Sequence, residues 1–252
     1  LGKIVYSIKK REKETVNVNI VNYFNDSDAY SKEILNFKGN PNSASMINKI
    51  TEFPERKDLI LKILNICLHD KRKILLLSDR RNHLKNLKQE LDKIENFTSG
   101  FYLGGMKKEE LEKTEKADVI LGTFSMASEG FDCKYPLNTI ILASPKTNIE
   151  QSVGRILRQE EKYRQKVPLI IDISDNFSLF SKQTKKREKF YKKNKYNIKI
   201  YDVDNNLISN VFTNTTQKHS KDNDNLSKDL CNGSDSKIKS NKKNVDDNDN
   251  YS

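Results

Sequence analysis

The sequence predicts an α/β fold in which a mostly parallel sheet carries helices on both faces. Five short apolar segments of four to seven residues are rich in Ile, Leu and Val and do not alternate with polar residues. Strands that are buried on both faces have this pattern. Segments with helical spacing lie between them, and strands that alternate with helices favour a parallel sheet.

The elements follow from these two patterns. In residues 55–68, Leu59, Ile63 and Cys67 recur at helical spacing, which predicts an amphipathic helix. A basic helix and a closing strand at 197–203 are expected after the last apolar segment. The strands are predicted at 73–78, 99–103, 117–123, 139–144 and 168–174, and the helices at 55–68, 82–94, 107–114 and 178–193.

The N-terminal part has a different pattern. Residues 3–10 and 15–21 alternate apolar and polar side chains, which is typical of two strands of a hairpin. Residues 25–45 are polar and contain Gly39-Asn40-Pro41. We therefore expect 1–44 to be the end of a preceding motor domain with a linker, and 45–204 to be the main domain.

The C-terminal part is predicted to be a disordered, low-complexity tail at 205–252. The forty residues from Thr213 onward include only six apolar ones. So few apolar side chains cannot offset the entropic cost of ordering the chain.

The net charge of +11 comes from 46 basic and 35 acidic residues. From Thr213 to the end, seven lysines balance seven aspartates, so the excess lies in residues 1–212. A basic globular part indicates a polyanionic partner, most often nucleic acid. A lysine-rich surface produced by compositional bias is the alternative.

Cysteine usage and hydropathy exclude several classes of protein. Cys67, Cys133 and Cys231 are scattered and form no C-x-x-C motif. We therefore expect no metal site and no disulfide framework, and we expect a reducing intracellular compartment. No apolar run approaches the roughly 18 residues that a membrane span requires, and no signal peptide is recognisable.

The segment Q-S-V-G-R-I-L-R-Q at 151–159 has the most specific pattern. At about 100° per residue, a helix would place Gln151, Arg155 and Arg158 on one narrow face and the aliphatic residues on the other. Two guanidinium groups suit phosphate oxygens. A solvated face would not require Gly154, which costs a helix about 1 kcal/mol. The segment therefore predicts a phosphate-facing edge.

The loop after the third apolar segment, G-T-F-S-M-A-S-E-G-F-D-C, is a second candidate. In parallel sheets, ligands bind at the carboxyl ends of the strands. The hydroxyl of Thr123 and the backbone near Gly130 can accept a phosphate, and Asp132 can accept a sugar hydroxyl. An ordinary strand-to-helix turn is the alternative for this loop.

These segments resemble the motifs of superfamily 2 helicases. Q-S-V-G-R-I-L-R is similar to motif VI, G-T-F-S-M-A-S-E-G-F-D to motif V, I-L-L-L-S-D-R-R-N-H-L to motif IV, and F-Y-L-G-G-M-K to the segment after it. The helicases of nucleocytoplasmic large DNA viruses and their relatives are the most similar. The resemblance covers about residues 1–203 and implies a RecA-like helicase C-terminal domain.

The resemblance also implies roles for individual residues. Arg158 would be the arginine finger that reaches the γ-phosphate of ATP. Arg155 would support the same phosphate or bridge to the opposing domain, and Gln151 would contact the nucleotide or the attacking water. Gly130 and Asp132 would bind the nucleotide near its ribose. The residues implied to contact the backbone of DNA or RNA are Ser78, Arg80, Gly105 and Thr123.

The sequence contains neither G-x-x-x-x-G-K-[ST] nor D-E-x-[HD]. In the family, these motifs bind ATP and Mg²⁺ and belong to the first motor domain, which the resemblance implies as the partner. We therefore expect an ATP-dependent helicase whose second domain is inactive alone. The alternatives are a non-catalytic nucleic-acid-binding module with the same fold and a small-molecule phosphate-binding α/β domain. The intact polar face at 151–158 favours the motor.

Overall fold

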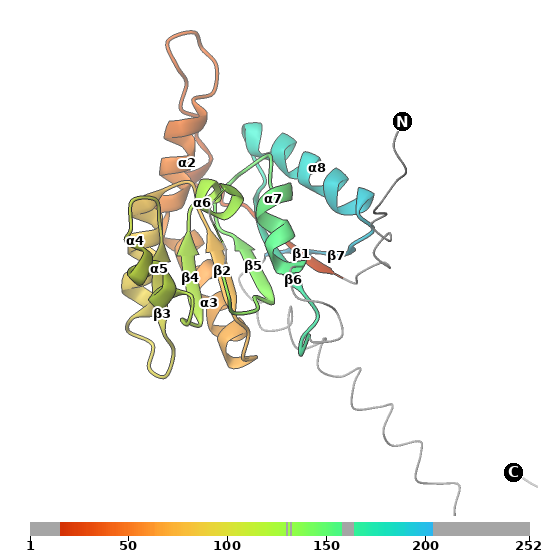
Figure 1. The fold of residues 1–252 in the computed structure, drawn as a ribbon. Helices are drawn as coiled ribbons and strands as arrows, with labels where there is room; N and C mark the ends of the chain where they lie inside the picture. Colours follow the sequence, from red (N-terminus) through yellow and green to blue (C-terminus); the bar gives the residue numbers. More distant parts are fainter. Residues whose placement is uncertain (1–15, 130, 132, 158–163, 204–252) are drawn as a thin grey trace, which may run out of the picture. The chain divides into compact units, whose positions relative to one another are not determined.

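The computed structural model of the protein describes residues 16–129, 131, 133–157 and 164–203. The predicted tail at 205–252 lies outside the described residues. Within them, seven strands form one parallel sheet in the order β3-β4-β2-β5-β6-β1-β7. Figure 1 shows helices on both faces of this sheet, with α7 in front of it and α3 behind it.

Six of the strands occur where the sequence predicts them, five in the apolar segments and β7 as the closing strand. All four residues of β2, β4 and β5 are buried, and so are all seven residues of β6. This burial explains why the segments do not alternate. The six strands are β2 (Ile74–Leu77), β3 (Ser99–Tyr102), β4 (Val119–Gly122), β5 (Thr139–Leu142), β6 (Leu169–Asp175) and β7 (Asn197–Asp202).

The strand predicted at 15–21 occurs as β1 (Asn17–Tyr23), but it belongs to the main sheet and not to a preceding domain that ends at residue 44. The strand predicted at 3–10 lies outside the described residues. Strand β1 lies between β6 and β7 and is parallel to both. Its polar side chains bond to the neighbouring strand and do not mark a solvated hairpin. Asn22 donates to Asp202 Oδ1 at 2.7 Å, and Asn197 donates to Asn17 Oδ1 at 3.0 Å.

The segment predicted as a linker contains regular structure as well. Helix α1 (Asp28–Ser31) follows β1, and α2 (Ser43–Glu52) begins before the expected boundary. The side chain of Asn42 accepts a hydrogen bond from the backbone N–H of Ser45 at 3.2 Å and caps α2. Between these helices, Leu35 and Pro41 form an isolated antiparallel bridge at the base of a projecting loop.

The helices divide between the two faces of the sheet. Helices α6 (Phe124–Glu129), α7 (Glu150–Val153) and α8 (Ser178–Lys193) share one buried apolar cluster with alternate residues of the strands. Helix α2 packs on α3 (Pro54–His69), which packs on α4 (Arg81–Leu91). The remaining helix, α5 (Lys108–Thr114), lies beside β3. No helix in the described part of the chain is long and apolar enough to cross a membrane.

Candidate nucleic-acid and nucleotide interface

Three loops at the carboxyl edge of the sheet meet in space. They follow β2, β3 and β4, which are adjacent strands. Arg81, which follows the first loop, donates from Nη2 to the carbonyl of Gly104 in the second loop at 3.0 Å. A Cβ placed on Gly104 would lie 3.6 Å from Met126 Sδ, just after the third strand. The parallel sheet therefore gathers the residues predicted to contact nucleic acid, because its carboxyl strand ends share one edge.

Ser78 lies in this group but does not face solvent. Its side chain is buried, its Oγ is 3.0 Å from His83 Nδ1, and it accepts a hydrogen bond from Arg80 N at 3.2 Å. The hydroxyl therefore fixes the turn into α4, and a contact between this residue and the nucleic-acid backbone stays a prediction. The sequence could not show that the side chain is buried, because burial at a strand end depends on the packing around it.

His83 is the buried partner of Ser78. Burial lowers the pKa of His83 to about 3, and the positive charge of Arg56 adds to this effect. The imidazole is therefore neutral at pH 7. Among the described residues, its Nε2 has no hydrogen-bond partner.

Arg80 joins the first loop to helix α2. Its guanidinium donates to the carbonyl of Ala44 at 3.0 Å and to the side-chain oxygen of Asn48. A cavity of about 290 Å³ lies between these two elements, and Arg80 and Arg81 are among the residues that line it. The predicted residue Arg80 thus lies at the candidate interface, where it also bonds to α2.

Arg81 is a residue that the sequence analysis missed. It is exposed and is the first residue of α4, an eleven-residue helix whose first turn receives no side-chain cap. Helix N-termini carry partial positive charge and bind phosphates. The Arg80-Arg81 dipeptide next to a strand end was the available signal for a second cation at this position.

Gly105 and Thr123 lie at the same edge. Gly105 is exposed with a φ of +90°, a conformation that glycine adopts without strain. Thr123 is half-buried, and its Oγ1 accepts a hydrogen bond from Met126 N at 3.4 Å and lies 3.2 Å from Ser125 Oγ. Both positions are therefore compatible with the predicted backbone contacts.

The helix predicted from residue 151 onward is shorter than expected. It is α-helical only over Glu150–Val153 and continues as the 3-10 helix η1 over Gly154–Leu157. The assumed rotation of 100° per residue is therefore wrong beyond Val153, because a 3-10 helix turns more tightly. The apolar side is confirmed by the buried residues Ile149, Val153 and Ile156. On the other side Gln151 is exposed and Arg155 is half-buried, and Arg158 lies outside the described residues.

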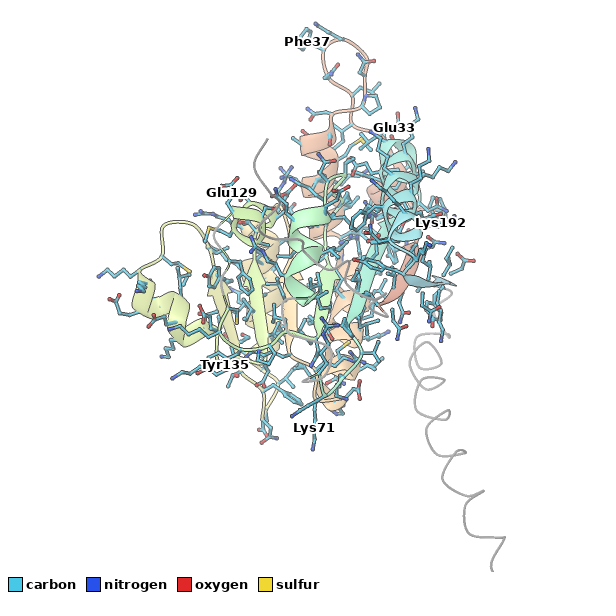
Figure 2. The ribbon with its side chains drawn as sticks, turned by 45° about the vertical axis from the view of Figure 1, so that its right-hand side comes forward. Glu33, Phe37, Lys71, Glu129, Tyr135 and Lys192 are labelled. Carbon is cyan, nitrogen blue, oxygen red and sulfur yellow. The ribbon has the colours of Figure 1, made fainter. Side chains whose placement is uncertain are left out.

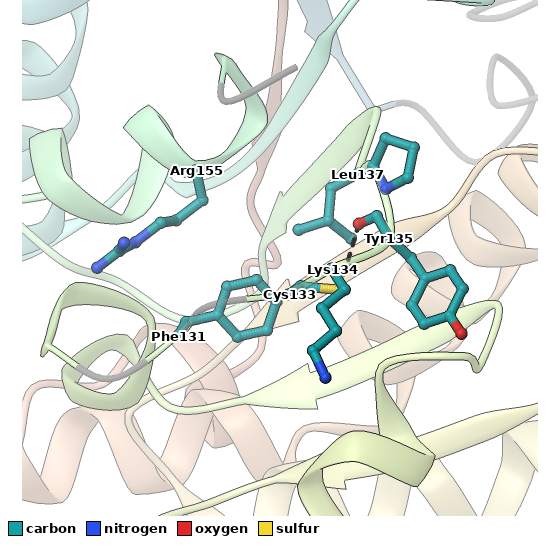
Figure 3. Close-up of a pocket in the computed structure, with 7 residues that line it drawn as sticks. Phe131, Cys133, Lys134, Tyr135, Leu137 and Arg155 are labelled. Atoms are coloured by element: carbon teal, nitrogen blue, oxygen red, sulfur yellow. Dashed lines mark hydrogen bonds between the residues drawn. The ribbon is translucent and has the colours of Figure 1, made fainter.

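Arg155 connects this helix to the end of α6. It donates from Nε to the carbonyl of Ala127 at 2.7 Å and from Nη2 to that of Ser128 at 2.5 Å. Figure 3 shows the side chain pointing from the end of α7 towards α6 and away from Tyr135. No carboxylate lies within ion-pair distance of Arg155 in the described part of the chain. Among the described residues, the guanidinium is therefore anchored by neutral carbonyl groups alone.

Gly154 lies next to Arg155 and is not required by crowding inside the chain. It is exposed, and a Cβ placed on it would meet no atom of the protein within 4 Å. Its φ of −57° suits any residue. The open space over Gly154 leaves room for another backbone or a ligand to approach from outside.

A cavity of about 300 Å³ lies beside the segment after α6. Phe131, Tyr135, Leu137 and Arg155 are among its lining residues. The predicted nucleotide-binding residues Gly130 and Asp132 belong to this segment but lie outside the described residues. Among the residues that the structure does describe, no group of three His, Cys, Asp or Glu side chains could hold a metal ion.

Two buried arginines hold the loop that leads to α7. Arg56 donates from Nη1 to the carbonyl of Ala143 at 2.9 Å, and Arg187 donates from Nη1 to that of Lys146 at 2.8 Å. Each is also paired with an aspartate of β6, Arg56 with Asp175 at 2.7 Å and Arg187 with Asp172 at 2.8 Å. The loop is thus fixed from both faces of the sheet.

The two buried arginines keep their positive charge. Burial opposes the charge on Arg56, but the charge and hydrogen bonds of Asp175 outweigh it and raise the pKa of Arg56. The same balance, with Asp172 as partner, raises the pKa of Arg187. Tyr30 donates a further hydrogen bond to Asp175 at 2.6 Å. Sequence analysis missed both arginines because their partners become neighbours only in the folded sheet.

Comparisons with known proteins find relatives of this chain among the proteins of large DNA viruses. A mimivirus protein from Acanthamoeba polyphaga mimivirus, provisionally named an ATP-dependent RNA helicase, is 40% identical over 171 residues, which cover 66% of this chain and 32% of the relative. A similarly named protein of African swine fever virus is 38% identical over 96 residues, covering 38% of this chain and 18% of the relative. The chain thus spans about a third or less of these relatives. No protein-family model matches it.

The fold also has solved counterparts. The structure of UvsW from T4 matches with a TM-score of 0.57 at 17% identity, over 76% of this chain and 42% of that chain. A likeness at this identity shows the fold alone. The predicted RecA-like class is confirmed. The predicted resemblance to helicases of large DNA viruses is confirmed by the named relatives.

Proposed function

We propose that this chain is the second motor domain of an ATP-dependent superfamily 2 helicase or translocase. Its relatives carry the name of ATP-dependent RNA helicases, and its fold is that of a RecA-like domain. The motifs that the sequence shares with that superfamily occur at the carboxyl edge of the sheet, where such folds bind ligands. A first motor domain would supply the phosphate loop and the Mg²⁺ ligands.

The observation that carries this proposal is the state of Arg155. Its Nε and Nη2 are bonded to the carbonyls at the end of α6, and no acceptor among the described residues is bonded to Nη1. Such an arginine is positioned in advance, and no carboxylate among the described residues neutralises its charge. It suits an anion with several oxygens, such as the terminal phosphate of ATP.

The residues of this chain would bind the nucleotide from one side. Gln151 and Arg155, with Arg158 three residues further on, would face the γ-phosphate of an ATP molecule held by the first domain. When ATP and Mg²⁺ are bound, hydrolysis supplies the free energy for movement. In other phosphoryl-transfer enzymes an arginine finger raises the rate about 10³- to 10⁵-fold.

The nucleic acid would lie over the loops that meet at Gly104. Arg81 and the N-terminus of α4 are suited to one phosphate, and the exposed backbone at Gly105 and the hydroxyl of Thr123 to its neighbours. Phosphates are common to DNA and RNA and carry no sequence information. Binding through them should weaken steeply with salt, because counterions are released.

A pair of variants in the full-length protein tests these roles separately. We expect Arg158→Ala to lower ATP turnover about 10³-fold or more while nucleic-acid affinity stays within about twofold of wild type. Arg81→Ala should weaken nucleic-acid binding and flatten its salt dependence by about one unit of slope, while turnover at saturating nucleic acid is retained.

Steady-state ATP turnover and fluorescence anisotropy measure the two effects. The reverse pattern, with binding lost in Arg158→Ala and turnover intact, would show that the roles are assigned wrongly. The chain of residues 1–252 without a first motor domain should show no nucleic-acid-stimulated ATP hydrolysis.

A further inference from the structure

Phe37 is the most exposed large apolar side chain in the described part of the protein. Its side chain is 93% exposed, whereas the next in order, Ile200, is 55% exposed. Burying a phenylalanine side chain stabilises a fold by about 1.5–3 kcal/mol, and the exposed side chain of Phe37 does not contribute this stabilisation. Single exposed apolar residues are common, so exposure alone does not assign a role.

The loop that carries Phe37 is held in one conformation. The side-chain oxygen of Asn36 accepts hydrogen bonds from Lys38 N at 2.9 Å and from Asn40 N at 3.1 Å. The backbone bonds Asn36 N to Asn40 O and Asn42 N to Ile34 O, at 2.8 and 2.7 Å, close its base. The aromatic ring is therefore presented by an ordered turn, and binding to it would cost little further conformational entropy.

The loop projects from the edge that carries the candidate nucleic-acid interface. Figure 2 shows Phe37 at its tip, well above the rest of the molecule, and Tyr135 far from it near the opposite end. The base of the loop leads into α2, where the carbonyl of Ala44 accepts a hydrogen bond from Arg80 at 3.0 Å. A strand bound along Arg80 and Arg81 would continue towards this loop.

The chemistry of the tip suits an unpaired nucleobase. Lys38 Nζ lies 5.5 Å from the centroid of the Phe37 ring, so a cation accompanies the aromatic face. Nucleobases stack on such rings in a sequence-tolerant way, and nearby lysines bind the phosphates. A base inside a duplex offers no free face, because both of its faces are stacked on its neighbours. The occupant that fits is therefore single-stranded nucleic acid.

We propose that the loop at 34–42 is a base-stacking platform, on which Phe37 holds an unpaired base of the strand that crosses the carboxyl edge of the sheet. This inference rests on the proposed nucleic-acid-binding function. The platform would lie outside the phosphate contacts of the three loops and would favour single-stranded over duplex substrate.

The chain contains no tryptophan, so a single one can report on this position. In Phe37→Trp, addition of a single-stranded uridine or thymidine 15-mer should quench the tryptophan fluorescence, and high salt should reverse the quenching. The matched control is Tyr135→Trp, a 40% exposed aromatic in the segment that precedes β5. Its fluorescence should not change.

A second pair of variants measures affinity by anisotropy. Phe37→Ala should weaken binding of the single-stranded 15-mer about 5- to 100-fold, Phe37→Tyr should bind like wild type, and blunt duplex affinity should not change. Because the ring is exposed, the melting temperatures of these variants should equal that of wild type.

The outcomes separate the two proposals. If the chain binds the 15-mer but Phe37→Trp is not quenched and Phe37→Ala binds normally, the stacking platform is overturned while the nucleic-acid interface stands. The same holds if Phe37→Trp responds only to a second copy of the protein or to a protein partner. If the wild-type chain binds no oligonucleotide at low salt, the interface itself is overturned, and the platform with it.

Discussion

The buried arginines beneath the carboxyl edge and the arginine at the end of α7 differ in what surrounds their charge. Arg56 and Arg187 are 0% and 3% exposed, and each pairs with an aspartate of β6. Arg155 is half-buried and meets only the carbonyls of Ala127 and Ser128 within the described chain. All three donate to backbone carbonyls near the same edge.

This difference distinguishes arginines that stabilise the fold from an arginine that can bind a ligand. Where a carboxylate neutralises the guanidinium, the arginine holds the loop from Ala143 to Lys146, and no charge remains for a ligand. Where neutral carbonyls anchor it, the arginine is equally well positioned, and no carboxylate among the described residues competes with an incoming anion. We infer that Arg56 and Arg187 position helix α7 by holding the loop before it. The segment that continues α7 then carries Arg155 to the edge of the sheet.

Removing a paired arginine should have the largest effect on stability. Arg56→Ala would leave the buried carboxylate of Asp175 with Tyr30 as its remaining side-chain partner, and we expect a loss of about 3–5 kcal/mol in the free energy of unfolding. Arg155→Ala removes hydrogen bonds that water can replace at a half-buried site, and should cost about 1 kcal/mol. Urea unfolding at pH 7 measures both.

Arg187→Ala is the matched variant on the other face of the sheet and should resemble Arg56→Ala. If Arg155→Ala were as destabilising as these two variants, the distinction between paired and unpaired arginines would be lost.

The pH dependence of stability sharpens the account of the paired region, because the charge of Arg56 contributes to the low pKa of His83. With a pKa of about 3 in the folded state and about 6.5 in the unfolded state, His83 binds more protons when unfolded between these values. Its contribution is complete above pH 6.5 and declines as the pH falls towards 3. We expect a loss of about 2 kcal/mol between pH 7 and pH 5.

Urea unfolding at both pH values measures this loss. His83→Gln should remove most of the pH dependence, whereas His69→Gln, at an exposed position, should retain it. If the pH dependence of stability persisted in His83→Gln, it would arise from another group, and the assignment to His83 would be wrong.

The smallest expected change concerns Gly154 in the unpaired region. Gly154→Ala should stabilise the isolated chain by about 0.4–1 kcal/mol, because its φ suits alanine and the new methyl group meets no atom. If another backbone or a ligand approaches Gly154 in the full-length protein, the same variant should lower ATP turnover. Higher stability with unchanged turnover would show that this surface stays open.

The strands could be predicted from the sequence because burial on both faces leaves unbroken Ile, Leu and Val segments such as β2 and β6. Strand β1 was misinterpreted because its asparagines bond across to β7, a pairing that local alternation cannot show. The helix at Gln151 was predicted in the right place, but its tightening into a 3-10 turn at Gly154 depends on tertiary packing.

The candidate site was only partly predictable for related reasons. Motif spacing located Arg80, Gly105, Thr123 and Arg155 at the carboxyl edge, because the order of strands and loops determines which residues follow the ends of the strands. The burial of Ser78 and the ion pairs of Arg56 and Arg187 depend on neighbours far away in the sequence, and no local pattern reports them.

ATP turnover by the full-length protein with Arg155→Ala, at saturating single-stranded nucleic acid, tests the central claim most directly. The account expects turnover to fall about 10³-fold or more while the affinity for nucleic acid and the cooperativity of unfolding are retained. Turnover close to that of wild type would contradict it, because an arginine that faces the terminal phosphate could not then be dispensable.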